Sequence, residues 1–183
     1  SAGIQTAYEE VRDFFHYADN YVDALDRRAE ALSNHVSPFA PDRMQQLVTY
    51  CAETHGLKVV LAAAQRPDLM RDYDRASRTL TLNIRMAPAT QFFQVAAHLA
   101  GLEQTNIMAE LIESAGFKTA EARSICRLGL ANYFAGALQM PYGAFLRAAE
   151  ERRYDIEELA QLFGASLEQV AHLQIGKPER KIL

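Results

Sequence analysis

The 183-residue sequence has no tryptophan and only two cysteines, Cys51 and Cys126. The two cysteines are far apart and match no metal-binding spacing, so we expect buried free thiols in a reducing compartment. Apolar runs long enough to cross a bilayer are lacking, and so are a signal peptide and a lipidation motif, which predicts a cytoplasmic protein without a membrane partner. Excess basic charge is lacking too, since the net charge is −4. This argues against a nucleic-acid footprint over the whole surface.

The stretch that organises the sequence is a predicted helix over residues 119–142. Thr119 suits an N-cap, Glu121 lies in the first turn, and Pro141 ends the run. Almost every face between these ends is apolar, which is typical of a central core helix. Four small residues are expected to let neighbouring elements approach closely: Ala131, Ala135, Gly136 and Ala137. Asn132 and Tyr133 are the polar groups predicted to line a cavity.

The rest of the chain predicts an α+β fold that is mostly helical. Helical periodicity over residues 8–32 has a possible break near Asp19 and Asn20, and a proline-containing linker follows over residues 33–41. Strands are expected over residues 57–62, 70–74 and 79–84, with Leu80, Leu82 and Ile84 on one face. Such a small sheet of two or three strands needs helices packed on one face. Those helices are predicted over residues 42–55, 89–102, 104–114 and 142–152.

The C-terminal part has the spacing of a helix-turn-helix. Asp155 can cap one helix, Gly164 can turn the chain, and Ser166 can cap the next helix with Gln169 at its third position. The second helix offers no arginine or lysine to a DNA groove, so a plain packing unit is the favoured interpretation. We therefore divide the chain into an N-terminal arm and linker (residues 1–40), a core (residues 41–152) and a C-terminal helical unit with a tail (residues 153–183).

The order of two strands, a helix with histidine and a long helix ending in Met-Pro resembles the ImmA/IrrE-type metallopeptidases, a zincin-like scaffold. The run ANYFAGALQMP at residues 131–141 matches the closing motif of that family. The family's zinc helix carries His-Glu-x-x-His, in which the histidines bind the metal and the glutamate is the general base. In this sequence Gln94 replaces the first histidine, Val95 replaces the base, and only His98 remains.

The third, acidic zinc ligand of the family is missing as well, because Leu128 and its neighbours occupy that region. One neutral histidine cannot hold a catalytic zinc ion, and valine cannot take a proton from water. We therefore expect no metal in this domain and no enzyme activity. His98 on its own is interpreted as a half-buried core histidine.

A narrower resemblance covers nearly the whole chain as far as residue 172. Segments at residues 9–15, 20–26, 73–80, 122–135 and 153–160 resemble the middle domain of the bacterial short-chain fatty acid regulators, which are RamB-, PrpR- and ScfR-like transcription factors. A degenerate zinc motif is usual in that family. The resemblance implies a regulator of acetate and propionate metabolism whose separate DNA-binding domain lies outside this sequence. It also implies that the middle domain senses CoA or a short-chain acyl-CoA.

An acyl-CoA sensor needs cations for the phosphates, an aromatic face for adenine and a small apolar pocket. Arg123 and Arg127, four residues apart on one helix, could clamp phosphate, although surface salt bridges are as plausible for Arg123. The ligand-binding set predicted for the cleft of the lost zinc site combines them with tyrosines and polar groups: Tyr21, Gln94, His98, Arg123, Arg127, Asn132, Tyr133 and Tyr142. The alternatives are a non-sensing module that forms a homodimer through its aromatic N-terminal arm and, less favoured, an active zinc peptidase.

Overall fold

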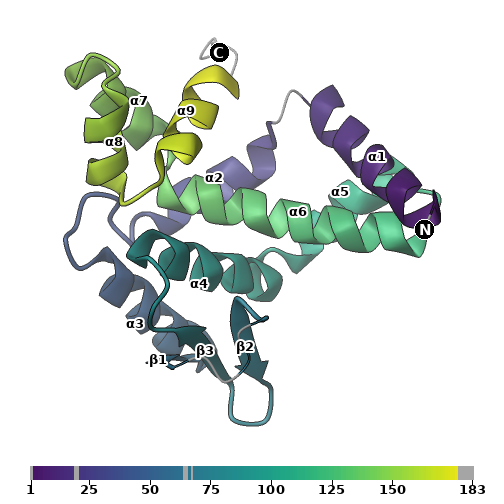
Figure 1. The fold of residues 1–183 in the computed structure, drawn as a ribbon, viewed down its shortest axis with the longest axis horizontal. Coiled ribbons are helices and arrows are strands. Elements are labelled where there is room, and N and C mark those ends of the chain that lie inside the picture. The colour runs from purple at the N-terminus through teal and green to yellow at the C-terminus, as the bar shows by residue number, and fades with distance from the viewer. Residues whose placement is uncertain (1, 19–20, 64–65, 67, 177–183) are drawn as a thin grey trace.

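The computed structural model describes residues 2–18, 21–63, 66 and 68–176 (Figure 1). The predicted mostly helical α+β fold with a small sheet is confirmed. Within these ranges the strands are β1 (Lys58–Ala62), β2 (Arg71–Asp74) and β3 (Thr79–Asn83). The helices are α1 (Ala2–Tyr17), α2 (Asp23–Leu32), α3 (Arg43–His55), α4 (Pro88–Glu103), α5 (Thr105–Ala115), α6 (Ala120–Gln139), α7 (Tyr142–Glu151), α8 (Ile156–Phe163) and α9 (Leu167–Gly176).

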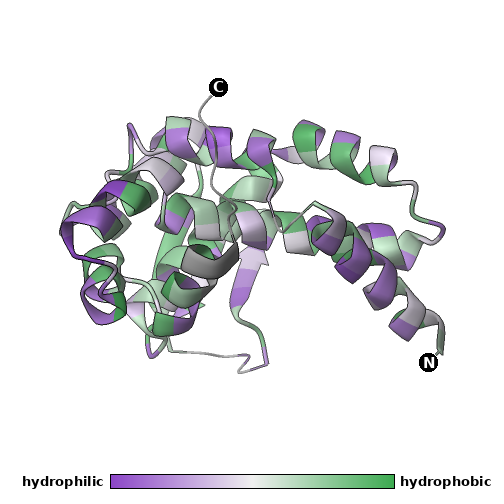
Figure 2. Cartoon of the chain, turned by 90° about the horizontal axis from the view of Figure 1, so that it is seen from above, coloured by the Kyte–Doolittle hydropathy of each residue, from purple (hydrophilic) through white to green (hydrophobic). Residues whose placement is uncertain are grey.

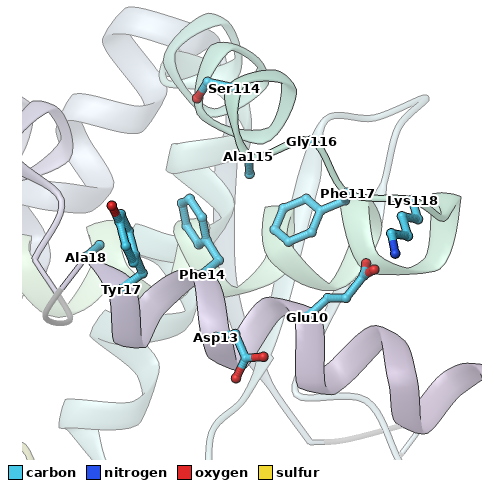
Figure 3. Close-up of a pocket in the computed structure, with 10 residues that line it drawn as sticks. All are labelled: Glu10, Asp13, Phe14, Tyr17, Ala18, Ser114, Ala115, Gly116, Phe117 and Lys118. Carbon is cyan, nitrogen blue, oxygen red and sulfur yellow. The ribbon is translucent and has the colours of Figure 1, made fainter.

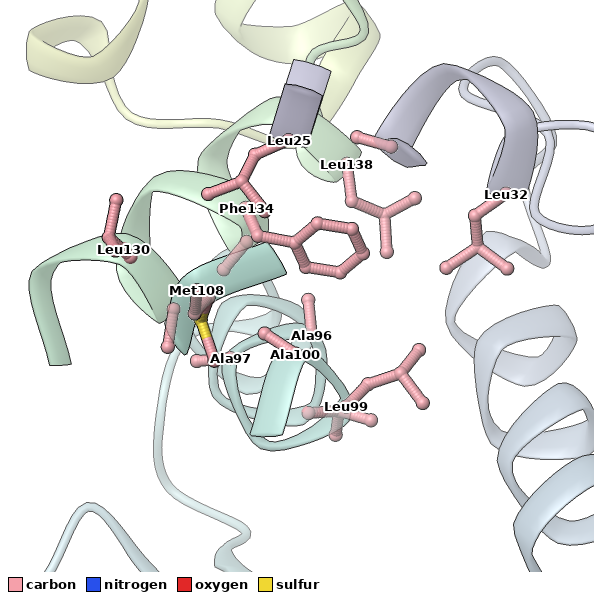
Figure 4. Packing of buried hydrophobic residues seen from close by; sticks show 14 of the residues in the cluster. Leu25, Leu32, Ala96, Ala97, Leu99, Ala100, Met108, Leu130, Phe134 and Leu138 are labelled. Atoms are coloured by element: carbon pink, nitrogen blue, oxygen red, sulfur yellow. The ribbon is translucent and has the colours of Figure 1, made fainter. Parts of the chain in front are cut away.

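Helix α6 runs through the middle of the molecule, as the apolar sequence of this stretch predicts. It packs against α4 on one side and against α1 and α2 on the other, and the sheet lies beyond α4 (Figure 1). Leucine and phenylalanine side chains of α6 meet leucines and alanines of α2 and α4 in the buried cluster shown in Figure 4. Phe134 is fully buried at the centre of this contact. Burying such a ring contributes roughly 1.5–3 kcal/mol to folding.

The sheet has the order β1-β3-β2, with β1 parallel and β2 antiparallel to β3. Leu80 and Leu82 are fully buried on the face that α4 covers. Arg71 is paired with Leu82 and Tyr73 with Leu80, so both β2 side chains point toward the same face. Ile84 was expected to share this face, which is wrong, because the strand ends at Asn83 and Ile84 is exposed.

The helix ends follow the local signals in the sequence. The Thr119 hydroxyl accepts a hydrogen bond from the backbone N–H of Ala122 at 3.1 Å, and the Asp155 carboxylate accepts one from Glu158 at 3.0 Å. Gly56 ends α3 in the left-handed conformation, with φ of 61°, which glycine adopts without strain. The predicted capping box is confirmed, because Ser166 and Gln169 exchange two hydrogen bonds.

The start of the first helix differs from the expectation, and so does Gly136, one of the four small residues of α6 that were expected to admit a neighbour. The first helix begins at Ala2 rather than near Tyr8, and its residues Ala7 and Val11 are buried. The predicted break near residues 19–20 lies outside the described residues. Gly136 has open space around it, whereas a Cβ at Gly129 would lie 2.9 Å from the Phe15 ring. Gly129 is therefore the small residue that lets α1 approach α6.

Helices α7, α8 and α9 enclose a second hydrophobic cluster, formed by residues between Met140 and Val170. Arg43 joins this cluster to the main core. Its guanidinium donates hydrogen bonds to the carbonyls of Leu138, Gln139 and Phe163 at 3.1, 2.9 and 2.8 Å, and it lies over the Phe92 ring. Burial lowers the pKa of Arg43 to about 10, which leaves it charged at neutral pH. The division at residues 40 and 152 stays a prediction, and residues 177–183 of the tail lie outside the described residues.

Hydrophilic and hydrophobic segments alternate along the helices (Figure 2). This pattern places apolar stripes against the core and leaves charged residues outside. Among the helices of the described ranges, none is both long enough and apolar enough to cross a membrane. Cys51 and Cys126 are buried and unpaired, as the sequence predicts, and burial raises the pKa of their thiols to about 12 and about 11.

Candidate functional site

Helix α4 carries Gln94 and His98, the two positions that were predicted to correspond to the family's zinc ligands, and both residues face strand β2. Gln94 is buried, and its Oε1 accepts a hydrogen bond from Nη1 of Arg71 at 2.7 Å. Burial lowers the pKa of the Arg71 guanidinium below its ordinary value. A half-buried cation therefore lies against the residue that replaces the family's first zinc ligand.

His98 lies one turn further along α4 and is half-buried, as the sequence predicts. Its ring centroid is 4.5 Å from that of Tyr73, the second β2 residue on this face. The Nε2 atom of His98 is buried and has no hydrogen-bond partner within the part of the chain that the structure describes. Burial and the positive charge of Arg71 both lower the pKa of His98, so its imidazole is neutral at pH 7. We call Arg71, Tyr73, Gln94 and His98 the β2–α4 cluster.

These positions do not fit a zinc ion. The Arg71 guanidinium binds Gln94 directly and would repel a metal cation at that place. Val95, at the position of the general base, is fully buried in the core, and Leu128 is 56% exposed on α6. Across the described ranges, no three histidine, cysteine, aspartate or glutamate residues come together in a group that could hold a metal ion.

A second polar group joins α6 to α2. The Tyr133 hydroxyl donates to Oδ2 of Asp26 at 2.5 Å and accepts from the backbone N–H of Val22 at 3.0 Å. Asp26 is only 2% exposed. Burial, followed by the negative charge of Asp26, raises the pKa of Tyr133 well above its ordinary value. Tyr21 is half-buried beside this group and donates a hydrogen bond to Asp23.

The other residues of the predicted set lie elsewhere. Arg123, Arg127 and Asn132 are exposed on α6, and Arg123 donates to the Phe117 carbonyl at 3.3 Å. Tyr142 is half-buried at the start of α7. The structure thus brings Gln94 together with His98. It also places Tyr21 near Tyr133, because the neighbouring Val22 is bonded to the Tyr133 hydroxyl. It does not gather all eight residues in one site. Their ligand-binding role stays a prediction.

Sequence reasoning missed three residues that complete these groups: Arg71, Tyr73 and Asp26. The alternation of the strand places Arg71 and Tyr73 on one face. However, the sequence does not give the register with β3 that turns this face toward α4. Asp26 looks like an ordinary polar residue of an amphipathic helix, and its burial depends on the packing of α2 against α6.

The sequence of residues 52–173 matches the IrrE N-terminal-like domain. A propionyl-CoA carboxylase regulator from Cereibacter sphaeroides is 46% identical over 90% of this chain. Two HTH-type transcriptional regulators of Mycobacterium tuberculosis are similar: RamB is 37% identical over 92% of this chain, and PrpR is 35% identical over 90%. The chain spans about a third of the length of these relatives, namely 34%, 36% and 34%.

A solved structure of a Mycobacterium tuberculosis transcriptional regulator has the same fold. It superimposes with a TM-score of 0.89 and 34% sequence identity, covering 96% of this chain and 53% of that chain. The resemblance to these regulators that the sequence motifs indicate is confirmed. The chain therefore belongs to the IrrE N-terminal-like domain family.

Proposed function

We propose that this chain is the effector-binding part of a transcriptional regulator of short-chain fatty acid metabolism, and that its effector is CoA or a short-chain acyl-CoA. The observation that carries the proposal is the β2–α4 cluster. At the predicted position of the family's zinc site, this chain has a half-buried arginine cation beside a neutral histidine whose Nε2 has no hydrogen-bond partner among the described residues. The names of the relatives support the regulatory role.

The chemistry of the cluster suits a phosphorylated ligand. The Arg71 guanidinium uses one N–H for Gln94, and its fork geometry favours pairing with phosphate. The Nε2 atom of His98 can exchange a hydrogen bond with the ligand, and the Tyr73 ring offers a face for adenine. The phosphate role of Arg123 and Arg127 stays a prediction, and their exposure leaves both guanidinium groups accessible to a long ligand.

A route from the cluster to the N-terminal arm runs through the core. Helix α4 packs on α6, and Tyr133 of α6 is bonded to the backbone of Val22 and to Asp26 of α2. We infer that effector binding favours one position of the arm. In a homodimeric cytoplasmic regulator, this position would change how a separate domain binds DNA. Such a shift requires different affinities for the two arm positions.

The activity of a zinc peptidase is not proposed, because Gln94, Val95 and Leu128 supply neither ligands nor a base. A dimerisation module without sensing is the second candidate. It is favoured by the exposed apolar side chains of α1, since Ile4 is 50% exposed and Tyr8 59%.

Thermal denaturation with CoA, acetyl-CoA and propionyl-CoA tests the sensor proposal. A ligand at a hundred times its dissociation constant stabilises the folded state by about 2.7 kcal/mol. We expect Arg71→Gln to abolish this stabilisation. Arg75→Gln, at an exposed position in the turn between β2 and β3, should retain it. If no member of the panel stabilises the wild-type chain, the sensor proposal is wrong and the dimerisation module is favoured.

A further inference from the structure

A cavity of about 540 Å³ lies between α1 and the turn that joins α5 to α6 (Figure 3). Its volume falls within the range of small-molecule sites. We call it the α1 pocket, and it shares no residue with the β2–α4 cluster. Its walls combine aromatic, acidic and small side chains with one lysine: Glu10, Asp13, Phe14, Tyr17, Ala18, Ser114, Ala115, Gly116, Phe117 and Lys118.

Glu10 carries the polar atom of this pocket that a ligand could satisfy. Its Oε2 atom is buried and has no hydrogen-bond partner among the described residues. The side chain reaches from α1 toward Phe117 and Lys118 (Figure 3), yet within the described ranges it forms no ion pair with Lys118 or with any other cation. A buried carboxylate oxygen without a donor is costly, and native proteins seldom leave one unsatisfied.

The aromatic walls define the rest of the ligand. Phe14 and Phe117 meet edge to face, with ring centroids 5.7 Å apart. Tyr17 is 93% exposed and forms the rim. Such rings bury an apolar body, and their faces attract a positive charge. The Arg123 guanidinium near this wall donates to the Phe117 carbonyl and so holds the turn in place.

We propose that the α1 pocket binds an amphipathic organic cation, with its ammonium group on Glu10 and its apolar body against Phe14 and Phe117. The ammonium would donate a hydrogen bond to Glu10 Oε2, which has no partner among the described residues. Asp13, whose Oδ1 lies 3.5 Å from Nη2 of Arg12, adds a second carboxylate on the same helix. An anionic ligand could pair with Lys118, but it would repel both carboxylates and leave Glu10 unsatisfied. This site is independent of the CoA proposal, because it uses different residues and the opposite ligand charge.

A charge series of one molecular shape tests the proposal on the 183-residue chain. Phenethylammonium, 2-phenylethanol and 3-phenylpropionate share a phenyl ring and a two-carbon link but differ in charge. We expect NMR titration with the ammonium to shift the amide signals of residues 114–118 and of α1 around Glu10. The alcohol should bind at least tenfold more weakly, because a hydrogen bond to a charged group is worth about a factor of ten or more.

Two matched variants sharpen the result. Glu10→Gln should weaken phenethylammonium binding about tenfold, whereas Glu9→Gln, at the exposed neighbouring position outside the pocket, should leave it unchanged. Equal binding of the ammonium and the alcohol to the wild-type chain overturns the proposal, whatever the folding of the variants. Tighter binding of the propionate, or no shift at residues 114–118 with any of the three, does so as well.

Discussion

The bond between Tyr133 and Asp26 gives a stability prediction that can be worked out from the structure. Tyr133→Phe keeps the ring and removes only the hydroxyl, which donates to Asp26 at 2.5 Å and accepts from Val22 at 3.0 Å. A hydrogen bond to a charged group contributes about 1.5–3 kcal/mol, and a neutral bond about 0.5–1.5 kcal/mol. We therefore expect the free energy of unfolding to fall by roughly 2–4.5 kcal/mol.

Urea denaturation at pH 7, followed by far-ultraviolet circular dichroism, measures this loss. The change should appear in the midpoint, with the denaturant slope unchanged. Tyr17→Phe is the matched control, because the Tyr17 side chain is 93% exposed and its substitution should alter stability by no more than about 0.5 kcal/mol. If Tyr133→Phe behaves like this control, the hydroxyl does not hold α2 on α6, and the proposed route to the arm loses its link.

Three further outcomes follow from features described above. The raised pKa of Tyr133 disfavours its ionised form in the folded state, so the free energy of unfolding of the wild type should fall as the pH rises above about 10. Melting curves at alkaline pH should show a smaller fall for Tyr133→Phe. Arg43→Met should lower the free energy of unfolding by about 3–5 kcal/mol, because three carbonyls lose a charged donor; urea titration checks this, and a loss below about 1 kcal/mol contradicts it. Gly101→Ala should raise the melting temperature, because a helical alanine is better than glycine by roughly 0.5–1 kcal/mol and the added methyl meets no atom within 4 Å. Gly129→Ala should lose that gain to the clash with Phe15, and equal melting temperatures for the two variants would refute the close approach.

Local signals were enough to predict most of the fold. Thr119, Asp155 and Ser166 cap their helices by bonds within three residues, so their chemistry can be read without tertiary contacts. Gly56 and Gly116 end helices in the conformation that glycine tolerates best. The start of the first helix was missed because the local signal points too far along the chain: Thr6 and Glu9 have the spacing of a capping box. In the structure the helix already begins at Ala2, and the Thr6 hydroxyl donates to the Ala2 carbonyl inside it.

The candidate site was less predictable, because it depends on how helices and strands face one another. Asn132 and Tyr133 are neighbours in sequence, but successive helical residues point about 100° apart. One is therefore exposed, while the other reaches Asp26. The role of Arg71 requires the β2–β3 register, which sets a residue of a short strand against α4. Gln94 and His98 could be found from sequence, because their four-residue spacing fixes a shared helix face.

The polar contacts around Arg43 and Gln139 bear on how this protein can be shortened. A chain ending before α7 would lose the second hydrophobic cluster, and Arg43 would lose the Phe163 carbonyl as an acceptor. The Gln139 side chain is 1% exposed, and it would lose its bonds to Gly164 and Gln169 while staying within the remaining protein. The last helices are therefore not a detachable appendage, and fragments for binding studies should extend at least through Val170.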